Sequence, residues 1–329
     1  MSRIVRFHRT GGPEVLQIDD LPVAAPKAGE IRIRVRALGL NRAEAMFRSG
    51  AYLEVPRLPA RLGYEAAGEV DAIGEGVTGF AEGDAVSTIP SFSMNDYGVY
   101  GETAIVPAHA VAKHPAGLSW TEAASIWMQY MTAYGALIDI GGLQKGEAVV
   151  ITAASSSVGL AAIQIANVVG AVPIAATRTH AKRDALLGAG AHHVIATQEQ
   201  DLAKEVMRAT DGRGARLAFD PVCGRGVDAL AEAMAPGGTI FLYGALSGEP
   251  TPFPLFPALA KNLVLRGYTL FSVVADAKRL ERGKRFIVEG IAGGRLKPII
   301  ARSFPLSDIV EAHRYLESNQ QFGKIVVTV

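Results

Sequence analysis

A loop of three serines is the first stretch of this sequence whose residue types point to chemistry. The segment ITAASSSVGLAAIQIA, residues 151–166, has the pattern of an apolar strand, a small-residue turn and an amphipathic helix. Such a turn directs backbone N–H groups and the positive end of a helix dipole at an anion. The strict G-x-G-x-x-G fingerprint is absent, but serine fits wherever φ is negative, and its hydroxyl adds a donor. We predict a phosphate-binding loop made by Ser155, Ser156, Ser157 and Val158; the alternative is a plain connection with a serine N-cap.

A run of basic residues follows the next apolar strand. The strand ends at Ala175-Ala176-Thr177, and Arg178-Thr179-His180-Ala181-Lys182-Arg183 comes directly after it. A site for NAD normally has Asp or Glu here to bind the ribose hydroxyls. Arg178 and Lys182 can instead pair with a 2′-phosphate, which an acidic residue would repel. The sequence therefore predicts NADP(H) as cofactor, with a solvated helix start as the alternative.

Six apolar runs alternate with helical patterns and position these residues. The runs are VVIT, VPIAA, HHVIA, RLAFDPV, TIFLYG and LVLRGY. Alternation of this kind predicts an α/β domain with a doubly wound parallel sheet, which we place at residues 126–302. The uncharged segment 148–177 is long enough to span a bilayer, but its serines, Asn167, Gly170 and Pro173 divide it into strand, turn, helix and strand. We expect a buried βαβ unit.

The flanking segments have a different pattern. Residues 1–125 are rich in Gly and Pro and contain short alternating runs such as EIRIRVRALGL, which predict antiparallel strands in a barrel-like β domain. Residues 303–329 predict a helix followed by GKIVVTV, an edge or closing strand. We expect this last segment to return to the first domain.

Composition excludes several classes of partner. Lys and Arg number 33 against 32 Asp and Glu, so the chain lacks the net positive charge that favours nucleic acid or an anionic membrane as a partner. We therefore expect a small-molecule ligand rather than nucleic acid or a membrane. The single cysteine, Cys223, forms neither an intramolecular disulfide nor a cysteine-based zinc cluster. The first residues lack the apolar stretch of a secretory signal, so we expect a cytoplasmic protein.

Several stretches together resemble the medium-chain dehydrogenase/reductase superfamily, and within it the zinc-independent quinone oxidoreductases. They are GLNRAEAMFRSGAY, LGYEAAGEVDAIGEGVTGFAEGDAV, TAYGAL, ITAASSSVGLAAIQIA, LLGAGAHHVI, FDPVCG and GKIVV, and they cover nearly the whole chain. The serine loop stands where these reductases have A-A-x-G-G-V-G. The resemblance implies a Rossmann domain, a GroES-like catalytic domain formed by residues 1–125 and 303–329, and a homodimer joined through a strand like LVLRGYTLF.

The resemblance also bears on metal binding. Zinc alcohol dehydrogenases of this superfamily bind their catalytic metal through a cysteine, a histidine in a G-H-E triplet, and a further Cys or Asp. The corresponding places here are Asn41 and Gly63-Tyr64-Glu65, and the lobe that would carry four structural cysteines has none. Zinc prefers N and S ligands, so we expect no metal site. Glu44 and Glu65 are instead expected in buried ion pairs with Arg42, Arg48 or Arg61.

The resemblance assigns further residues to the site. Asn41 matches a position beside the nicotinamide, and Tyr52 matches a substrate-side tyrosine; Tyr64 takes the place of a zinc-ligand histidine. Thr132 and Gly244 are expected beside the cofactor, and Lys324 is expected either at the cofactor phosphates or on the solvated surface. For the tyrosines the alternative is packing with the hydroxyl satisfied locally, and for Asn41 it is a turn.

Without a Lewis acid, alcohol oxidation is difficult, whereas hydride transfer to an electron-poor acceptor needs only alignment and hydrogen-bond donors. We therefore predict an NADPH-dependent reductase of quinones or α,β-unsaturated carbonyls. The alternatives are a zinc-dependent alcohol dehydrogenase and a non-catalytic NADPH-binding protein. The sequence leaves open which acceptor is used and whether a residue or solvent supplies the proton.

Overall fold

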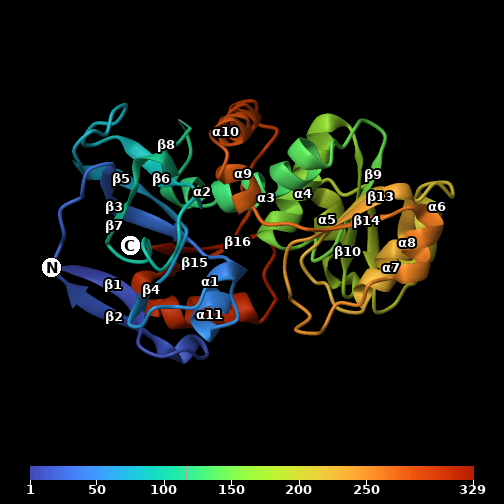
Figure 1. Cartoon of the computed structure of the whole chain (residues 1–329), viewed down its shortest axis with the longest axis horizontal. Coiled ribbons are helices and arrows are strands. Elements are labelled where there is room, and N and C mark those ends of the chain that lie inside the picture. The colour runs from blue at the N-terminus through green and yellow to red at the C-terminus, as the bar shows by residue number, and fades with distance from the viewer. Residues whose placement is uncertain (116) are drawn as a thin grey trace. The chain divides into compact units, whose positions relative to one another are not determined.

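The chain folds into two compact units. The computed structural model describes residues 1–115 and 117–329. One unit contains residues 1–128 and 298–329, and the other contains residues 129–297 (Figure 1). This division falls a few residues from the boundaries that we proposed from the sequence.

The second unit, which we call the nucleotide unit, is built on a six-stranded parallel sheet. Its order is β11-β10-β9-β12-β13-β14. The strands are β9 (Ala148–Ile151), β10 (Val172–Thr177), β11 (His193–Ala196), β12 (Ala215–Asp220), β13 (Met234–Leu242) and β14 (Val264–Gly267). The six strands predicted from apolar runs are confirmed, and the strand order reverses between β9 and β12. In open α/β sheets, ligands bind at the carboxyl ends of strands beside such a reversal.

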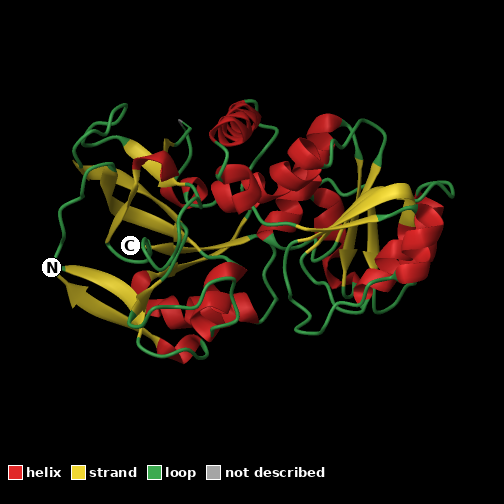
Figure 2. Ribbon diagram, in the orientation of Figure 1, coloured by secondary structure: helices red, strands yellow, loops and turns green. Residues whose placement is uncertain are grey.

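Helices connect these strands (Figure 2). They are α4 (Ser157–Val169), α5 (Arg183–Gly188), α6 (Leu202–Ala209), α7 (Gly226–Ala233), α8 (Leu255–Lys261), α9 (Phe271–Val274) and α10 (Ala277–Ala292), while α3 (Trp127–Tyr134) runs across the division between the units. The uncharged segment 148–177 forms β9, α4 and β10, as predicted. Within the described residues, no helix combines the length and apolar character that a membrane span requires.

The core of the nucleotide unit explains why its apolar runs become strands. Val150, Ile174 and Ala218 from adjacent strands pack with Val206 of α6 and Leu230 of α7, all of them buried. A strand covered by helices on both faces has no polar side to present, so continuous apolar runs are favoured over alternation.

The first unit, which we call the β unit, contains two mainly antiparallel sheets. A three-stranded sheet has the order β2-β1-β4, and a seven-stranded sheet has the order β15-β16-β3-β5-β6-β8, with β7 paired to β3. The strands are β1 (Ser2–Phe7), β2 (Leu16–Leu21), β3 (Glu30–Gly39), β4 (Ala60–Arg61), β5 (Glu65–Ile73), β6 (Ala85–Thr88), β7 (Thr103–Pro107), β8 (Val111–Lys113), β15 (Ile300–Pro305) and β16 (Lys324–Thr328). The helices are α1 (Arg42–Ser49), α2 (Trp120–Ala123) and α11 (Ile309–Glu317).

The last strand returns to the β unit, as the sequence predicts. Its position differs in detail, because β16 lies inside the sheet, parallel to β15 on one side and antiparallel to β3 on the other. Its apolar residues Ile325, Val326 and Val327 are buried. An edge or closing strand was expected, and the position between two strands accounts for the unbroken apolar character of the run.

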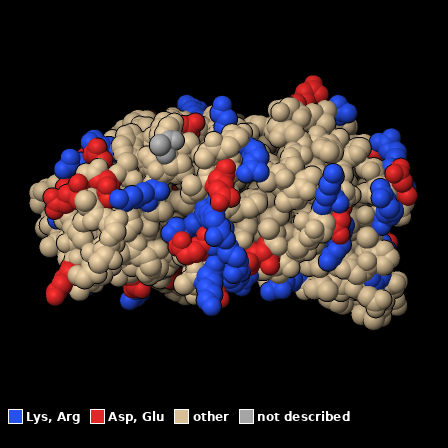
Figure 3. All heavy atoms as spheres, turned by 90° about the horizontal axis from the view of Figure 1, so that it is seen from above, with Lys and Arg blue, Asp and Glu red and all other residues tan. Residues whose placement is uncertain are grey.

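The charge balance is also visible on the surface. Figure 3 shows Lys and Arg side chains interspersed with Asp and Glu on the face that it draws.

Candidate functional site

The serine loop is connected directly to the basic residues that follow β10. Lys182 Nζ donates a hydrogen bond to Ser155 Oγ (3.1 Å). Ser156 is the N-cap of α4, and its Oγ accepts a hydrogen bond from the backbone N–H of Gly159 (3.0 Å). Ser157 and Val158 begin the helix, where backbone N–H groups have no acceptor within the helix itself. The loop therefore has the serine cap of one reading, and its helix start offers backbone N–H groups; anion binding there stays a prediction.

Gly159 allows this loop to lie close to its helix. A Cβ atom at Gly159 would lie 2.7 Å from the Ala154 carbonyl oxygen and 2.8 Å from that of Ala153. Ala153 itself has a positive φ of 45°. The loop and α4 are therefore in close contact at Gly159, since any larger residue would push the loop away from the helix.

The basic residues differ in their surroundings. Arg178 is exposed directly after β10, whereas Lys182 is half-buried. Burial, and then the nearby charge of Arg178, lower the pKa of Lys182 below its ordinary value. An anion that paired with this ammonium would relieve both effects. His180 is bonded to Glu199, a carboxylate that sequence analysis did not place beside this cluster.

Two further candidates for cofactor contact are Gly244, after strand β13, and Thr132, in helix α3. Gly244 follows β13, and a Cβ atom there would lie 2.6 Å from the Pro221 carbonyl oxygen. Thr132 is buried in α3, where its carbonyl accepts a hydrogen bond from the Tyr268 hydroxyl (2.9 Å). Their contact with a cofactor stays a prediction.

A buried polar cluster surrounds Asn41 in the β unit. Asn41 caps α1, and its Oδ1 accepts a hydrogen bond from Lys324 Nζ (2.6 Å). Its Nδ2 lies 3.2 Å from an oxygen of Glu44 and 3.2 Å from an oxygen of Glu65. Lys324 also forms an ion pair with Glu65, with both side chains at 1% exposure or less. Asn41 is thus the N-cap of α1, rather than the turn residue of the alternative reading, and also a member of a charged network.

This cluster corrects two expectations. Lys324 is not on the solvated surface, because its ammonium is buried and bonded to Asn41 and Glu65. That ammonium is committed within the β unit and presents no solvated charge to a phosphate. Glu65 pairs with Lys324 rather than with an arginine, and Arg48 pairs with Glu317 (2.6 Å).

Glu44 also differs from expectation, since backbone and amide groups satisfy its carboxylate. The backbone N–H groups of Asn41 (2.8 Å) and Tyr64 (3.1 Å) donate to it. Burial raises the pKa of Glu44 to about 7 despite these donors.

Tyr52 and Tyr64 lie side by side. The Tyr64 hydroxyl donates toward the Tyr52 hydroxyl at 3.5 Å, and their ring centroids are 6.5 Å apart. Tyr64 is fully buried, whereas Tyr52 is half-buried. Burial raises the pKa of Tyr52 to about 12, so its phenol is protonated at neutral pH. Tyr52 is the more exposed member of this pair, and its contact with a substrate stays a prediction.

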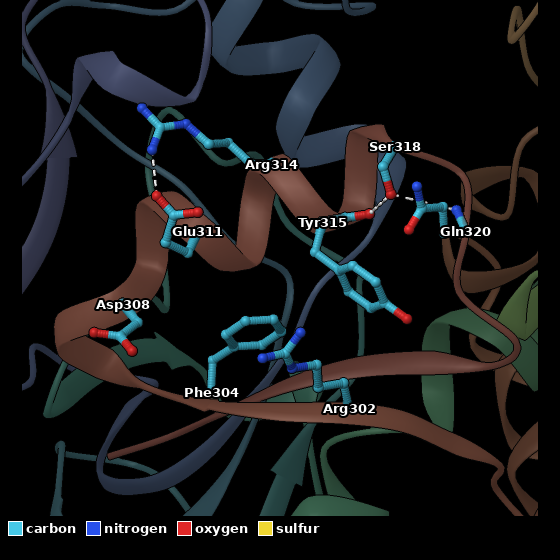
Figure 4. A pocket seen from close by; sticks show the side chains of 8 residues that line it. All are labelled: Arg302, Phe304, Asp308, Glu311, Arg314, Tyr315, Ser318 and Gln320. Atoms are coloured by element: carbon cyan, nitrogen blue, oxygen red, sulfur yellow. Dashed lines mark hydrogen bonds and ion pairs between the residues drawn. The ribbon is translucent and has the colours of Figure 1, made fainter.

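A separate cavity of about 360 Å³ opens between β15 and α11 (Figure 4). The Arg302 guanidinium lies over the rings of Phe304 (4.6 Å) and Tyr315 (5.6 Å). Arg314, Asp308 and Glu311 also line the cavity, so its charges balance. None of the site residues predicted from the sequence lines it, and it is not the candidate site.

The residues present do not suit a catalytic zinc ion. Within residues 1–115 and 117–329, no group of three or more His, Cys, Asp or Glu side chains is arranged around a common point. At the family's ligand positions, Asn41 and Tyr64 offer an amide and a phenol, and Glu65 is already paired with an ammonium.

Comparison with known proteins places these observations in a family. Residues 27–116 match the alcohol dehydrogenase GroES-like domain, and residues 157–282 match the domain described as zinc-binding dehydrogenase. A quinone oxidoreductase from Homo sapiens is 31% identical over 330 residues, which cover 99% of this chain and 98% of that protein. The chain belongs to the medium-chain dehydrogenase/reductase superfamily.

Two other members of the superfamily extend the comparison. The crystal structure of Escherichia coli quinone oxidoreductase complexed with NADPH is similar, with a TM-score of 0.92, 30% identity and 100% coverage of both chains. A 2-haloacrylate reductase from Burkholderia sp is 28% identical over 98% of this chain and 97% of its own length. The similarity therefore covers both units rather than the nucleotide unit alone.

Proposed function

We propose that this protein is an NADPH-dependent oxidoreductase that reduces a quinone or an α,β-unsaturated carbonyl without a metal ion. NADPH, when bound, supplies a hydride to the acceptor. The observation that carries the proposal is the hydrogen bond from Lys182 to Ser155, because it joins the basic residues to the phosphate loop. The relatives named above, a quinone oxidoreductase that binds NADPH and a haloacrylate reductase, support the same chemistry.

The nucleotide unit fits a dinucleotide that carries a 2′-phosphate. The start of α4 offers backbone donors to the bridging phosphates, with Ser157 and Val158 at the first positions. Lys182 and Arg178 follow β10, where the adenosine ribose lies in Rossmann domains, and both carry positive charge. An NAD-specific site would need an acidic side chain at the same place.

The β unit supplies the group that binds the acceptor. Because Tyr64 donates toward Tyr52, the hydrogen of the Tyr52 hydroxyl is left to donate to an acceptor oxygen. Negative charge develops on that oxygen as hydride adds to a conjugated carbon, so this donor stabilises the transition state more than the ground state. Asn41 has its amide bonded inside the unit, and it supports the wall of the site beside Tyr64.

Turnover measurements test this proposal. The purified chain is mixed with NADPH or NADH and with benzoquinone or a short enone, and loss of the reduced nicotinamide absorbance is followed. We expect faster turnover with NADPH, unchanged after dialysis against a chelator. The Tyr52→Phe variant should lose about 10²-fold in kcat, whereas Tyr97→Phe, a matched change at a tyrosine bonded to Glu30, should not.

Different outcomes would favour the alternatives. Activity that disappears with the chelator and returns with zinc would favour an alcohol dehydrogenase. Binding of NADPH without turnover of any acceptor would favour a non-catalytic binding protein.

We also propose that the protein is a homodimer and that it works in the cytoplasm. The strand β14 is the outer strand of its sheet, with unpaired backbone groups along one side. Apolar side chains are exposed beside it, including Val264 (50%), Leu259 (67%) and Phe256 (81%). Pairing of two β14 strands would cover this surface, and the single reduced cysteine is compatible with the compartment.

A further inference from the structure

A tyrosine hydroxyl at the carboxyl edge of the nucleotide sheet is buried without a partner. Tyr243 directly follows β13, and its hydroxyl oxygen has no hydrogen-bond partner among the residues that the structure describes. A buried hydroxyl left unpaired costs folding free energy, so native proteins seldom keep one without a reason. The hydroxyl oxygen itself is buried, whereas the residue as a whole is half-buried.

The surroundings of Tyr243 fix its ring. The ring stacks on Phe219 of the neighbouring strand, with centroids 4.0 Å apart and an interplanar angle of 17°. The Tyr243 backbone N–H donates to the Asp220 carbonyl (3.0 Å). Nearby, the Tyr268 hydroxyl is already satisfied by the Thr132 carbonyl. The orientation of Tyr243 is therefore set by packing and backbone contacts, and its hydroxyl takes no part in holding it.

The position of Tyr243 identifies the ligand. The phosphate loop follows β9, and Tyr243 follows β13, on the other side of the reversal in strand order between β9 and β12. A dinucleotide crosses that reversal with its adenosine half on the side of β10 and its other half toward β12 and β13. The predicted cofactor residue Gly244 is next in the chain, and Tyr268, which interacts electrostatically with Tyr243, is bonded to the predicted cofactor residue Thr132.

We propose that the Tyr243 hydroxyl donates a hydrogen bond to an oxygen of the nicotinamide half of the cofactor, on its carboxamide or its ribose. This inference rests on the proposed binding of NADPH and deepens it. Burial raises the pKa of Tyr243 well above its ordinary value, so the hydroxyl keeps the proton that it donates. The partner that the free protein lacks is supplied by the ligand.

This role has an unusual consequence for the Tyr243→Phe variant. Removing a hydroxyl that has a hydrogen-bond partner within the protein lowers the stability of the fold. Removing an unpaired buried hydroxyl does not. The variant without ligand should therefore melt at the same temperature as the wild type or higher. Its affinity for NADPH and for NADH should fall by the same factor, about three- to ten-fold, because both carry the same nicotinamide half.

Titration calorimetry and thermal unfolding of the full chain test the inference. Wild type and Tyr243→Phe are titrated with NADPH, with NADH, and with an adenosine bisphosphate that carries the 2′-phosphate but no nicotinamide. The bisphosphate should bind both proteins equally. Tyr100→Phe, which removes another unpaired buried hydroxyl in the β unit, should leave all affinities unchanged. Tyr268→Phe, which breaks the bond to Thr132, should lower the melting temperature.

Three results would overturn the inference. Unchanged dinucleotide affinity in Tyr243→Phe would mean that the hydroxyl meets only a buried water molecule. Equal weakening of the bisphosphate would mean that the substitution distorts the whole unit, and a lower melting temperature of the free variant would mean that the hydroxyl has a partner within the protein. If the wild type binds neither dinucleotide, the proposed function fails and this inference falls with it.

Discussion

Replacing Lys182 by methionine should convert a protein that prefers NADPH into one that hardly distinguishes it from NADH. Methionine keeps the length of the apolar stem but removes the ammonium. Lys182 is half-buried and held 3.1 Å from Ser155 Oγ, so its charge is positioned before a ligand arrives. A hydrogen bond to a charged group contributes about 1.5–3 kcal/mol.

The expected size of the effect lies inside this range. Arg178 remains in the variant, but it is exposed and its charge is screened by solvent. We therefore expect a loss of about 2 kcal/mol, or roughly a 30-fold increase in the Kd for NADPH. NADH has no 2′-phosphate, and its Kd should change by no more than about two-fold.

Titration calorimetry at two ionic strengths measures this difference. Added salt should weaken NADPH binding to the wild type more than to the variant, because the variant has lost one charge contact. The matched control is Lys204→Met on α6, at a side chain that is 84% exposed and paired with Asp201. It should bind both cofactors as the wild type does. Equal weakening of NADPH and NADH in Lys182→Met, or no weakening of either, would refute the assignment of the basic residues.

Three further predictions concern the β unit, the metal and the assembly. Lys324→Met should lower the free energy of unfolding by about 3–5 kcal/mol, because Glu65 is left buried without its cation. The double variant, Lys324→Met with Glu65→Met, should recover most of this loss. Urea unfolding followed by tryptophan fluorescence measures the stability of this unit, since Trp120 and Trp127 both lie in it. Glu44 has a folded pKa of about 7 against 4.5 ordinarily, so the folded state binds the proton more tightly, and the stability that this contributes is lost as pH rises from about 4.5 to about 7. The wild type should lose up to roughly 3 kcal/mol across that window, and Glu44→Gln should not show this decline. Val264→Lys should shift the protein toward monomers in sedimentation velocity, because it places a charge on the outer strand β14.

Each of these has a contrary result. A double variant at Lys324 and Glu65 as unstable as the single one would show that packing, not charge, sets the loss. A pH profile unchanged by Glu44→Gln would assign the titration to another group. A wild-type protein that sediments as a monomer at all concentrations would refute the proposed homodimer.

The nucleotide unit could be predicted from the sequence because its signals are local. Each of its strands contains a mainly apolar run, and the connections contain small residues or a helical pattern. The link between the serine loop and Lys182 was within reach for the same reason, since consecutive parallel strands bring their carboxyl ends to one edge of the sheet. Only the atom pair, Lys182 Nζ with Ser155 Oγ, required the structure.

The β unit shows where such reasoning stops. The partner of Glu65 is Lys324, 259 positions away, and no local pattern marks the two as a pair. The arginines next to Glu44 and Glu65 in the sequence were plausible partners by proximity, but α1 turns Arg48 toward Glu317 and His313 on α11. The orphaned hydroxyl of Tyr243 also has no signal in the sequence, because a tyrosine after a buried strand is most often satisfied locally.

The position of β16 between β15 and β3 sets an order for folding during synthesis. The nucleotide unit is one continuous stretch of chain, so it can be completed while the ribosome is still making residues beyond it. The β unit, in contrast, waits for an inner strand of its larger sheet, and until residue 324 emerges Glu65 lacks the ammonium of Lys324. A ribosome stalled in the last thirty or so codons would release a chain with a finished nucleotide unit and an open, charged β sheet, which quality-control proteases recognise.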